Sequence, residues 1–203
     1  MEKINMSKTA EVADLALSLK EHGHKIINMA SGELSFKPAF SIRKEACRTI
    51  NKGETLYTQV VGLNKLRKLL SDKLKKDLEV DYKSDEIIVS NGGKQVIYWV
   101  SYPEIIKLCG GKPKVLNTTR KEDFSINTER LEKLITSKTK WIILNSPNNP
   151  TGVVYSPETI RKLVLVLRKY PDIWILSDEI YEKLNFSTDK NLSILHIDKK
   201  LKE

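Results

Sequence analysis

The sequence predicts an α/β protein with a mainly parallel sheet and flanking helices. From residue 86 onward, short apolar runs alternate with stretches that carry helix-capping signals, and this alternation is typical of a parallel sheet. The 203 residues are 40% hydrophobic and 30% charged. That composition supplies enough apolar material for one packed core and too much for a disordered chain.

The first eighty residues are expected to form three helices. In residues 7–22 apolar side chains repeat at helical spacing, and Gly23 follows as a stop signal. Residues 41–50 form a second predicted helix, and the apolar run 26–30 before it predicts a short strand. The third, residues 63–78, is amphipathic with a basic outer face. Its apolar stripe consists of Leu63, Leu66, Leu70 and Leu74.

The remaining chain is expected to supply the sheet and its helices. Helices are predicted at 103–109, at 128–135 with Asn127 as the cap, and after Ser156, which is followed by a proline in the first helical turn. Four apolar runs between helical segments predict strands. They are residues 86–90, 114–117, 140–145 and 172–177.

Charge and cysteine usage exclude several classes of function. The net charge of +9 permits binding to nucleic acid, but the lysines are interspersed with acids and form no stripe with stacking aromatics, so we expect a solvated surface. Cys47 and Cys109 are isolated from each other and from histidines, so we expect buried free thiols and no metal site. No apolar run is long enough for a membrane helix or a secretion signal, which predicts a cytoplasmic protein.

Polar residues gather where three predicted strands end. Asn91-Gly92-Gly93-Lys94 is a weak phosphate-loop candidate that matches no nucleotide motif, and without other motifs an ordinary strand-to-helix turn with a surface lysine is the better explanation. Residues 145–152 are dense in Asn, Pro and Gly and predict a tight turn. Asp178 follows an apolar strand directly, so its carboxylate needs either a backbone cap or a cationic ligand. Open α/β sheets bind ligands at this edge.

Five motifs in a fixed order carry a resemblance to a known family. They are Ser31-Gly32-Glu33, residues 91–95, residues 98–103, residues 145–152 and residues 177–181. Together they resemble class I/II pyridoxal-phosphate-dependent aminotransferases, in the bacterial aspartate aminotransferase branch. The resemblance implies a fold-type-I large domain, usually in a homodimer. Residues 1–30 are then expected to form an N-terminal helix and short strand, and residues 31–203 a partial cofactor-binding domain.

The resemblance implies a role for each matched residue around the cofactor ring. Asp178 is similar to the carboxylate that pairs with the pyridine nitrogen and keeps the ring an electron sink. Asn149 and Tyr181 match residues that hydrogen-bond the phenolic oxygen, and Trp99 matches the aromatic side chain against the ring face. Trp99 and Asn149 also match substrate-binding positions, and so does Gly32, on the loop that meets the substrate carboxylate.

Four further residues match positions around the cofactor phosphate. Gly92, Gly93 and Lys94 fall on the phosphate loop. Tyr57 matches the tyrosine that reaches the cofactor phosphate of a partner subunit. Taken singly, most of the matched residues are better explained by ordinary roles, such as core aromatics for Trp99 and Tyr181 and a turn glycine for Gly32.

The sequence departs from the family pattern in three places. The family's Schiff-base lysine lies beyond the segment that residues 1–203 resemble, so the catalytic residue is unknown and this chain alone is expected to be inactive. Only twelve residues, 91–102, stand where the family places a helix and a further strand. Leu34-Ser35 replaces the Pro-Asp that usually follows Gly-Glu in the family.

Three interpretations stay open at the sequence level. The chain is part of an aminotransferase that transfers an amino group between an amino acid such as aspartate and a 2-oxo acid, as a homodimer or completed by a second chain that carries the lysine. Alternatively, it is a degenerate noncatalytic remnant, or it is a module that binds the cofactor or a partner. Neither nucleic acid nor a membrane is expected as a partner.

Overall fold

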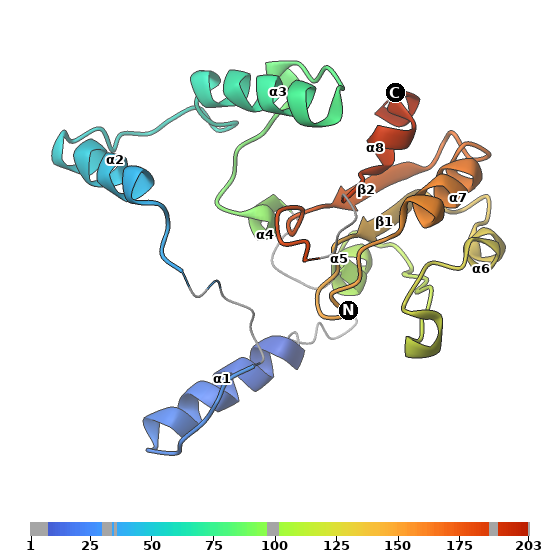
Figure 1. The fold of residues 1–203 in the computed structure, drawn as a ribbon, viewed down its shortest axis with the longest axis horizontal. Coiled ribbons are helices and arrows are strands. Elements are labelled where there is room, and N and C mark those ends of the chain that lie inside the picture. The colour runs from blue at the N-terminus through green and yellow to red at the C-terminus, as the bar shows by residue number, and fades with distance from the viewer. Residues whose placement is uncertain (1–7, 30–33, 35, 97–101, 187–190, 203) are drawn as a thin grey trace.

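A computed structural model describes residues 8–29, 34, 36–96, 102–186 and 191–202. Three helices, α1 (Lys8–Glu21), α2 (Phe40–Asn51) and α3 (Asn64–Leu78), are strung out along the chain before the α/β part that contains both strands (Figure 1). The remaining helices are short, apart from α7. They are α4 (Gly93–Val96), α5 (Tyr102–Leu108), α6 (Thr128–Leu134), α7 (Pro157–Leu167) and α8 (Ile194–Ile197), with 3₁₀ turns η1 (Ser84–Glu86), η2 (Arg120–Glu122) and η3 (Lys199–Lys202).

The predicted helices are confirmed, and two of them begin at the predicted caps. The side chain of Asn127 accepts a hydrogen bond from the backbone N–H of Arg130 at the start of α6. Ser156 does the same for the N–H of Thr159 at the start of α7, where Pro157 occupies the first turn. Both caps satisfy a backbone donor that the helix itself leaves without a partner.

The sheet in the described residues consists of two parallel strands, β1 (Trp141–Asn145) and β2 (Trp174–Asp178). They pair without offset, from Trp141 opposite Trp174 to Asn145 opposite Asp178. The two tryptophans stack at the amino ends with ring centroids 5.9 Å apart. This pair confirms the predicted strands 140–145 and 172–177.

Two other predicted strands are wrong, and a third is wrong over the part that the structure describes. Residues 87–90, 114–117 and 26–29 form no strand, and Ala30 lies outside the described residues. Within the first of these runs, the N–H of Val89 donates to the carbonyl of Val61 at 3.1 Å, and Val61 lies in the loop before α3. A strand needs a neighbour with which to exchange hydrogen bonds, and an apolar run alone does not supply one.

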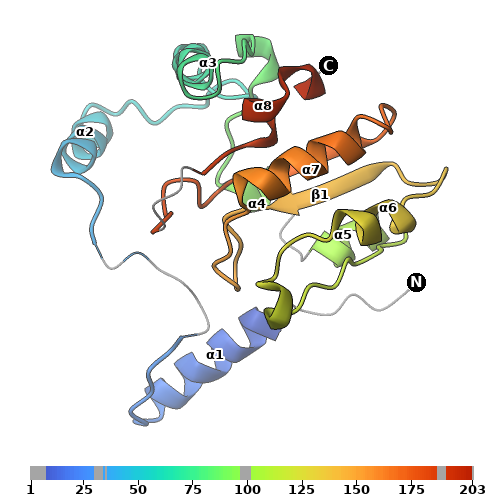
Figure 2. The same ribbon diagram turned by 45° about the vertical axis from the view of Figure 1, so that its right-hand side comes forward.

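The hydrophobic core lies between the strand pair and the helices α6, α7 and α8. Leu163 of α7 is completely buried, and Ile142 and Leu144 of β1 are also buried. Figure 2 shows α7 running alongside β1. The other buried members of this cluster are Leu131, Ile160, Val164, Val166, Leu167 and Ile194. Burial of each such side chain is worth about 1.5–3 kcal/mol.

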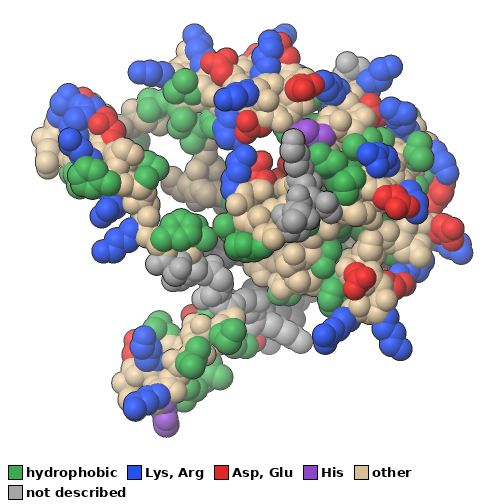
Figure 3. Space-filling model, in the orientation of Figure 1, with side chains coloured by type: hydrophobic (Ala, Val, Ile, Leu, Met, Phe, Trp, Pro, Cys, Tyr) green, Lys and Arg blue, Asp and Glu red, His purple; other side chains and the backbone are tan. Residues whose placement is uncertain are grey.

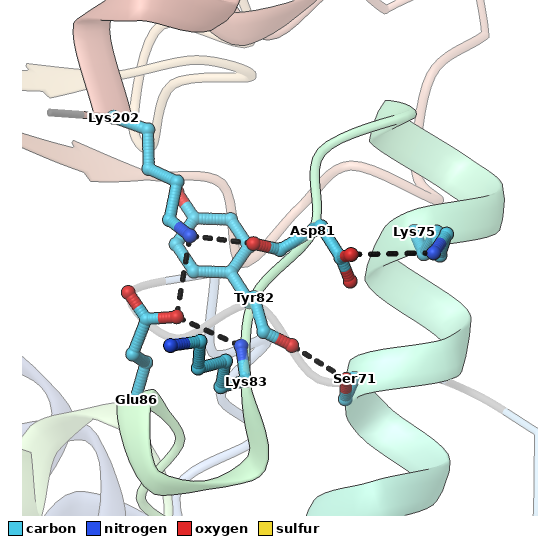
Figure 4. Close-up of polar contacts among 7 residues, drawn as sticks. All are labelled: Ser71, Lys75, Asp81, Tyr82, Lys83, Glu86 and Lys202. Atoms are coloured by element: carbon cyan, nitrogen blue, oxygen red, sulfur yellow. Dashed lines mark hydrogen bonds and ion pairs between the residues drawn. The ribbon is translucent and has the colours of Figure 1, made fainter.

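The C-terminal segment fastens α3 to the rest of the molecule (Figure 4). Lys202 donates to the backbone carbonyl of Asp81 and to the carboxylate of Glu86, and its ammonium lies 4.6 Å from the centre of the Tyr82 ring. His196 of α8 contacts α3 itself, because its Nδ1 accepts from the Ser193 N–H while its Nε2 meets the Asp77 carbonyl at 3.1 Å. Because Nδ1 accepts, Nε2 is the nitrogen that donates to the Asp77 carbonyl.

Two further links join α3 to the loop that follows it, on the side of this loop away from Lys202. The Ser71 hydroxyl donates to the carbonyl of Tyr82, and Lys75 forms an ion pair with Asp81 at 3.2 Å (Figure 4). The loop after α3 is therefore held from the helix on one side and from η3 on the other.

The first two helices bury almost nothing. No residue of α2 is buried, and none of residues 11–21 in α1 is buried. Figure 3 shows hydrophobic side chains on the surface of both helices. The prediction of buried thiols is wrong, since Cys47 on α2 and Cys109 after α5 are both exposed. Among the described residues, no helix is long and apolar enough to span a membrane.

Candidate functional site

The candidate site lies where β1 and β2 end together. Asn145 and Asp178 form the last pair of the parallel ladder, and the N–H of Ser146 still reaches the Asp178 carbonyl at 3.3 Å. Beyond it, the chain turns back through Pro147 and Pro150, both of which follow cis peptide bonds. Proline lacks the N–H that a continuing strand requires. The segment after β1 therefore leaves the sheet at its carboxyl edge.

Asp178 is half-buried, and both of its carboxylate oxygens have partners. The hydroxyl of Tyr102 donates to Oδ2, and the N–H of Ile180 donates to Oδ1 at 3.2 Å. Burial is the main cause that raises the pKa of the Tyr102 hydroxyl well above its usual range, and the hydrogen bond to Asp178 adds to it. Tyr102 therefore stays protonated and remains a donor to the carboxylate throughout the physiological range.

Asn149 and Tyr181, which the resemblance assigns to one cofactor oxygen, lie together. The Asn149 amide donates to the Tyr181 hydroxyl at 3.2 Å. Tyr181 follows Asp178 by one tight turn, and Asn149 follows β1 by four residues. The adjacent ends of the two parallel strands thus bring three of the predicted ring contacts to the same edge of the sheet.

The predicted phosphate loop lies beside this edge, at α4 (Figures 1 and 2). Gly92 adopts φ +83, a conformation that favours glycine. Two backbone donors of the loop are already engaged: the N–H of Asn91 bonds to Gln95 Oε1 at 2.6 Å and that of Gly92 to the Ser90 carbonyl at 2.8 Å. Gly93 opens α4, which is a single turn of four residues.

Other predicted site residues are placed elsewhere or not described. Gly32 and Trp99 lie outside the described residues, and only the backbone of Lys94 is described. Tyr57 is fully exposed, in the loop between α2 and α3. The roles assigned to these four residues stay predictions.

Sequence reasoning assigned no role to Tyr102 or Asn145, although both touch this site. Tyr102 is separated from Asp178 by 76 positions and Asn145 by 33. Asn145 does have a signal in the sequence, because a polar amide ends an otherwise apolar strand. Tyr102 lies within a recognised motif, but nothing in its local pattern shows which residue it would meet.

The donors and acceptors at the strand ends suit one end of pyridoxal phosphate. A carboxylate is the right partner for a protonated ring nitrogen, and an amide and a hydroxyl suit a phenolic oxygen. Asp178, Asn149 and Tyr181 supply these groups, so the ring end fits. The phosphate end is less complete, because the N–H groups of Asn91 and Gly92 are turned to internal acceptors. Among the described residues, no group of three His, Cys, Asp or Glu side chains is arranged to hold a metal ion.

The chain is an α/β protein with a parallel strand pair, and its structural likeness to solved aspartate aminotransferases places it in the fold-type-I class. The family model for aminotransferase class I and II matches residues 24–98 and 95–201. The chain belongs to this family. It spans about half the length of the curated relatives it matches.

Relatives and solved structures agree on the branch of the family. A probable aspartate/prephenate aminotransferase of Rickettsia felis is 39% identical over 222 positions, covering 100% of this chain and 54% of the relative. An aspartate aminotransferase of Bacillus subtilis is 39% identical, covering 97% of this chain and 55% of the relative. The solved aspartate aminotransferase of Thermus thermophilus with maleate has a TM-score of 0.89 at 30% identity, covering 96% of this chain and 55% of that chain.

These comparisons also support the predicted internal shortening. The alignment with the Rickettsia felis relative runs over 222 positions although the chain has 203 residues, so at least the difference consists of positions that this chain lacks. The two matches to the family model meet at residues 95–98. This meeting point lies within residues 91–102, where the sequence leaves no room for a helix and a strand.

Proposed function

We propose that this chain forms the cofactor-binding part of a pyridoxal-phosphate-dependent aminotransferase that acts on an amino acid such as aspartate and on a 2-oxo acid. The observation that carries the proposal is the meeting of Asp178, Asn149 and Tyr181 at one edge of the strand pair. Membership of the aminotransferase family supports it. The proposed domain is residues 31–203, in the cytoplasm, as a homodimer or joined by a second chain.

Each proposed ring contact has a separate task. When bound, the cofactor supplies a ring that withdraws electrons from the substrate α-carbon. The Asp178 carboxylate holds the proton on the ring nitrogen, and Tyr102 restrains one of its two oxygens. Asn149 and Tyr181 donate to the phenolic oxygen and orient the ring in its plane. Asp178 ends β2, and Asn149 and Tyr181 lie in the turns that follow the two strands, so the strand pair places these groups before the ligand arrives.

The remaining roles follow the resemblance residue by residue. We propose Gly92, Gly93 and Lys94 for the phosphate and Trp99 for the ring face. Gly32 faces the substrate carboxylate in this proposal, and Tyr57 reaches the phosphate of a second subunit. The full exposure of Tyr57 is compatible with a role outside its own chain.

Binding is tested with pyridoxine 5′-phosphate, which lacks the aldehyde and so cannot label surface lysines. A calorimetric titration and a thermal melt are run with the 203-residue chain, because a ligand that binds the native state raises the midpoint. We expect Asp178→Asn to weaken binding about 10- to 100-fold, since a charge-assisted hydrogen bond is lost. Equal affinity of the two proteins contradicts the assignment of Asp178.

Activity is tested in the same preparation with aspartate and 2-oxoglutarate. The family's reactive lysine lies beyond the part that residues 1–203 match, so we expect no steady transamination from this polypeptide alone. Turnover that Asp178→Ala abolishes would overturn that expectation and extend the proposal.

A noncatalytic remnant is the second candidate, and one observation favours it. The phosphate loop leads into a helix of a single turn, and two of its N–H groups are engaged internally. If the titration shows no binding of pyridoxine 5′-phosphate and the melt is indifferent to it, this second candidate is the better account of the chain.

A further inference from the structure

Asn145, the last residue of β1, makes hydrogen bonds with both ends of its side-chain amide. Its Nδ2 donates to the backbone carbonyl of Asp178 at 3.1 Å. Its Oδ1 accepts from the side-chain amide of Asn148 at 3.0 Å and from the N–H of Asn149 at 3.4 Å. The side chain is half-buried. One amide thus joins the end of β2 to the turn that follows β1.

The partners fix which way the Asn145 amide faces. A backbone carbonyl can only accept a hydrogen bond and a backbone N–H can only donate one. A flipped amide would set oxygen against the Asp178 carbonyl and nitrogen against the Asn149 N–H. Both contacts would become repulsive, so the orientation follows from the chemistry of Asp178 and Asn149.

The two backbones that Asn145 joins belong to the residues proposed for two different polar groups of the cofactor ring. Asp178 is assigned to the ring nitrogen and Asn149 to the phenolic oxygen. The ring is rigid, so the spacing of these two residues determines whether both bonds form at once. We propose that Asn145 is a positioning residue that sets this spacing without touching the ligand; this inference rests on the proposed function above.

The rest of the turn holds its shape through other bonds. The N–H of Asn148 donates to the Val153 carbonyl at 2.9 Å, and that of Gly152 donates to the Asn148 carbonyl at 2.8 Å. The N–H of Ser146 keeps β1 joined to Asp178. Loss of the Asn145 amide therefore leaves the turn closed and the strands paired, while the side-chain link from the Asp178 carbonyl to Asn148 and Asn149 is lost. Variants at this position are expected to fold.

The most informative substitution is Asn145→Asp. It keeps the size and an acceptor for the N–H of Asn149 but sets a carboxylate oxygen against the Asp178 carbonyl. The matched control is Asn127→Asp on α6, because Asn and Asp are equivalent helix caps and the bond from the Arg130 N–H is retained. This control adds the same charge outside the proposed site.

Three ligands separate positioning from general damage. They are pyridoxine 5′-phosphate, its 3-O-methyl ether, which weakens the phenolic contact, and its analogue with carbon in place of the ring nitrogen. We expect the wild-type chain to prefer the parent compound over each analogue by about tenfold. Asn145→Asp should weaken the parent about tenfold and bring both preference ratios close to one. Asn127→Asp should leave affinity and ratios unchanged.

Each outcome decides a different point. A purely structural role for Asn145 would weaken all three ligands by the same factor, and unchanged preference ratios in Asn145→Asp overturn the inference. If Asp178→Asn also leaves the affinity for the parent unchanged, the proposed function fails as well, so the two failures are distinguishable.

The link is also measured without any ligand, by NMR of the free chain. We expect the amide resonance of Asn149 to shift, and its hydrogen exchange to quicken about tenfold, in Asn145→Ala but not in Asn127→Asp. An Asn149 amide that is unaffected by Asn145→Ala overturns the inference even if no cofactor analogue binds.

Discussion

The helices α7 and α2 are both amphipathic, but only α7 has its apolar face buried. Five residues of α7 are buried, among them Leu163, whereas no residue of α2 is buried. On α2, Ile42 and Ile50 are each 64% exposed. The periodicity of a helix therefore predicts that an apolar face exists. It does not supply the surface that covers the face, which for α7 is the strand pair.

The first prediction, with the largest expected effect, compares a buried leucine of α7 with an exposed leucine of α1. Leu163→Ala should lower the free energy of unfolding by about 2–5 kcal/mol, because it opens a cavity in the core. Leu15→Ala, on a side chain of α1 that is 60% exposed, should change it by no more than about 0.5 kcal/mol. Urea unfolding followed by circular dichroism measures both. Similar losses in the two variants would show that α1 is covered in solution.

The second prediction concerns the pair that ties α7 to the C-terminal segment. Arg168 bonds to the buried carboxylate of Asp198 at 2.5 Å and holds the pKa of that group below its usual value. The ionised Asp198 carboxylate thus stabilises the fold fully above the ordinary carboxyl pKa of about 3.9. This stabilisation is lost as the pH falls through the lower pKa of the folded state. Asp198→Asn should make stability depend less on pH in the acid range. The free energy of unfolding involved should be smaller than the loss expected for Leu163→Ala.

The measurement is a series of thermal melts between pH 6 and pH 2. Asp81→Asn serves as the control, since Asp81 is 73% exposed in its side chain and belongs to a surface pair. If the melting midpoint falls equally steeply with pH in wild type and Asp198→Asn, protonation of Asp198 is not the cause of the acid destabilisation.

The third and smallest prediction exchanges helix caps between the two regions. Ser156→Ala removes the bond to the Thr159 N–H and should cost about 1 kcal/mol of unfolding free energy. Ala39→Ser gives α2 a capping side chain that it lacks. Because α2 buries nothing, this change should leave global unfolding unaffected while the helical circular dichroism signal rises slightly. A rise in global stability would contradict the separation of the two regions.

The helices were the part of the fold best predicted from the sequence, because their signals are local. Ser156 and Asn127 are caps that act within three residues. The strand predictions at 86–90 and 114–117 failed, because apolar runs say nothing about whether a neighbouring strand is present. The prediction that both cysteines are buried failed for a related reason. Burial was inferred from residue type, and α2 and α5 bury no residue.

The site was predictable to the extent that strand ends determine it. Parallel strands bring their carboxyl ends to one edge, so Asp178 and Asn149 were expected near each other. Contacts made by particular rotamers were not expected. The hydroxyl of Tyr102 on Asp178 and the amide of Asn145 depend on side-chain directions across 76 and 33 residues, which no local pattern encodes.

The offset-free pairing of β1 with β2 limits which changes of chain length this protein tolerates. Side chains alternate between the two faces of a strand, so removing one residue between Trp174 and Asp178 would turn the acid to the opposite face. The two matches to the family model meet at residues 95–98, outside both strands. A change of length there leaves the phase of these two strands intact. The chain can thus change length between secondary-structure elements without disturbing the site, whereas the length of β1 and β2 themselves is fixed.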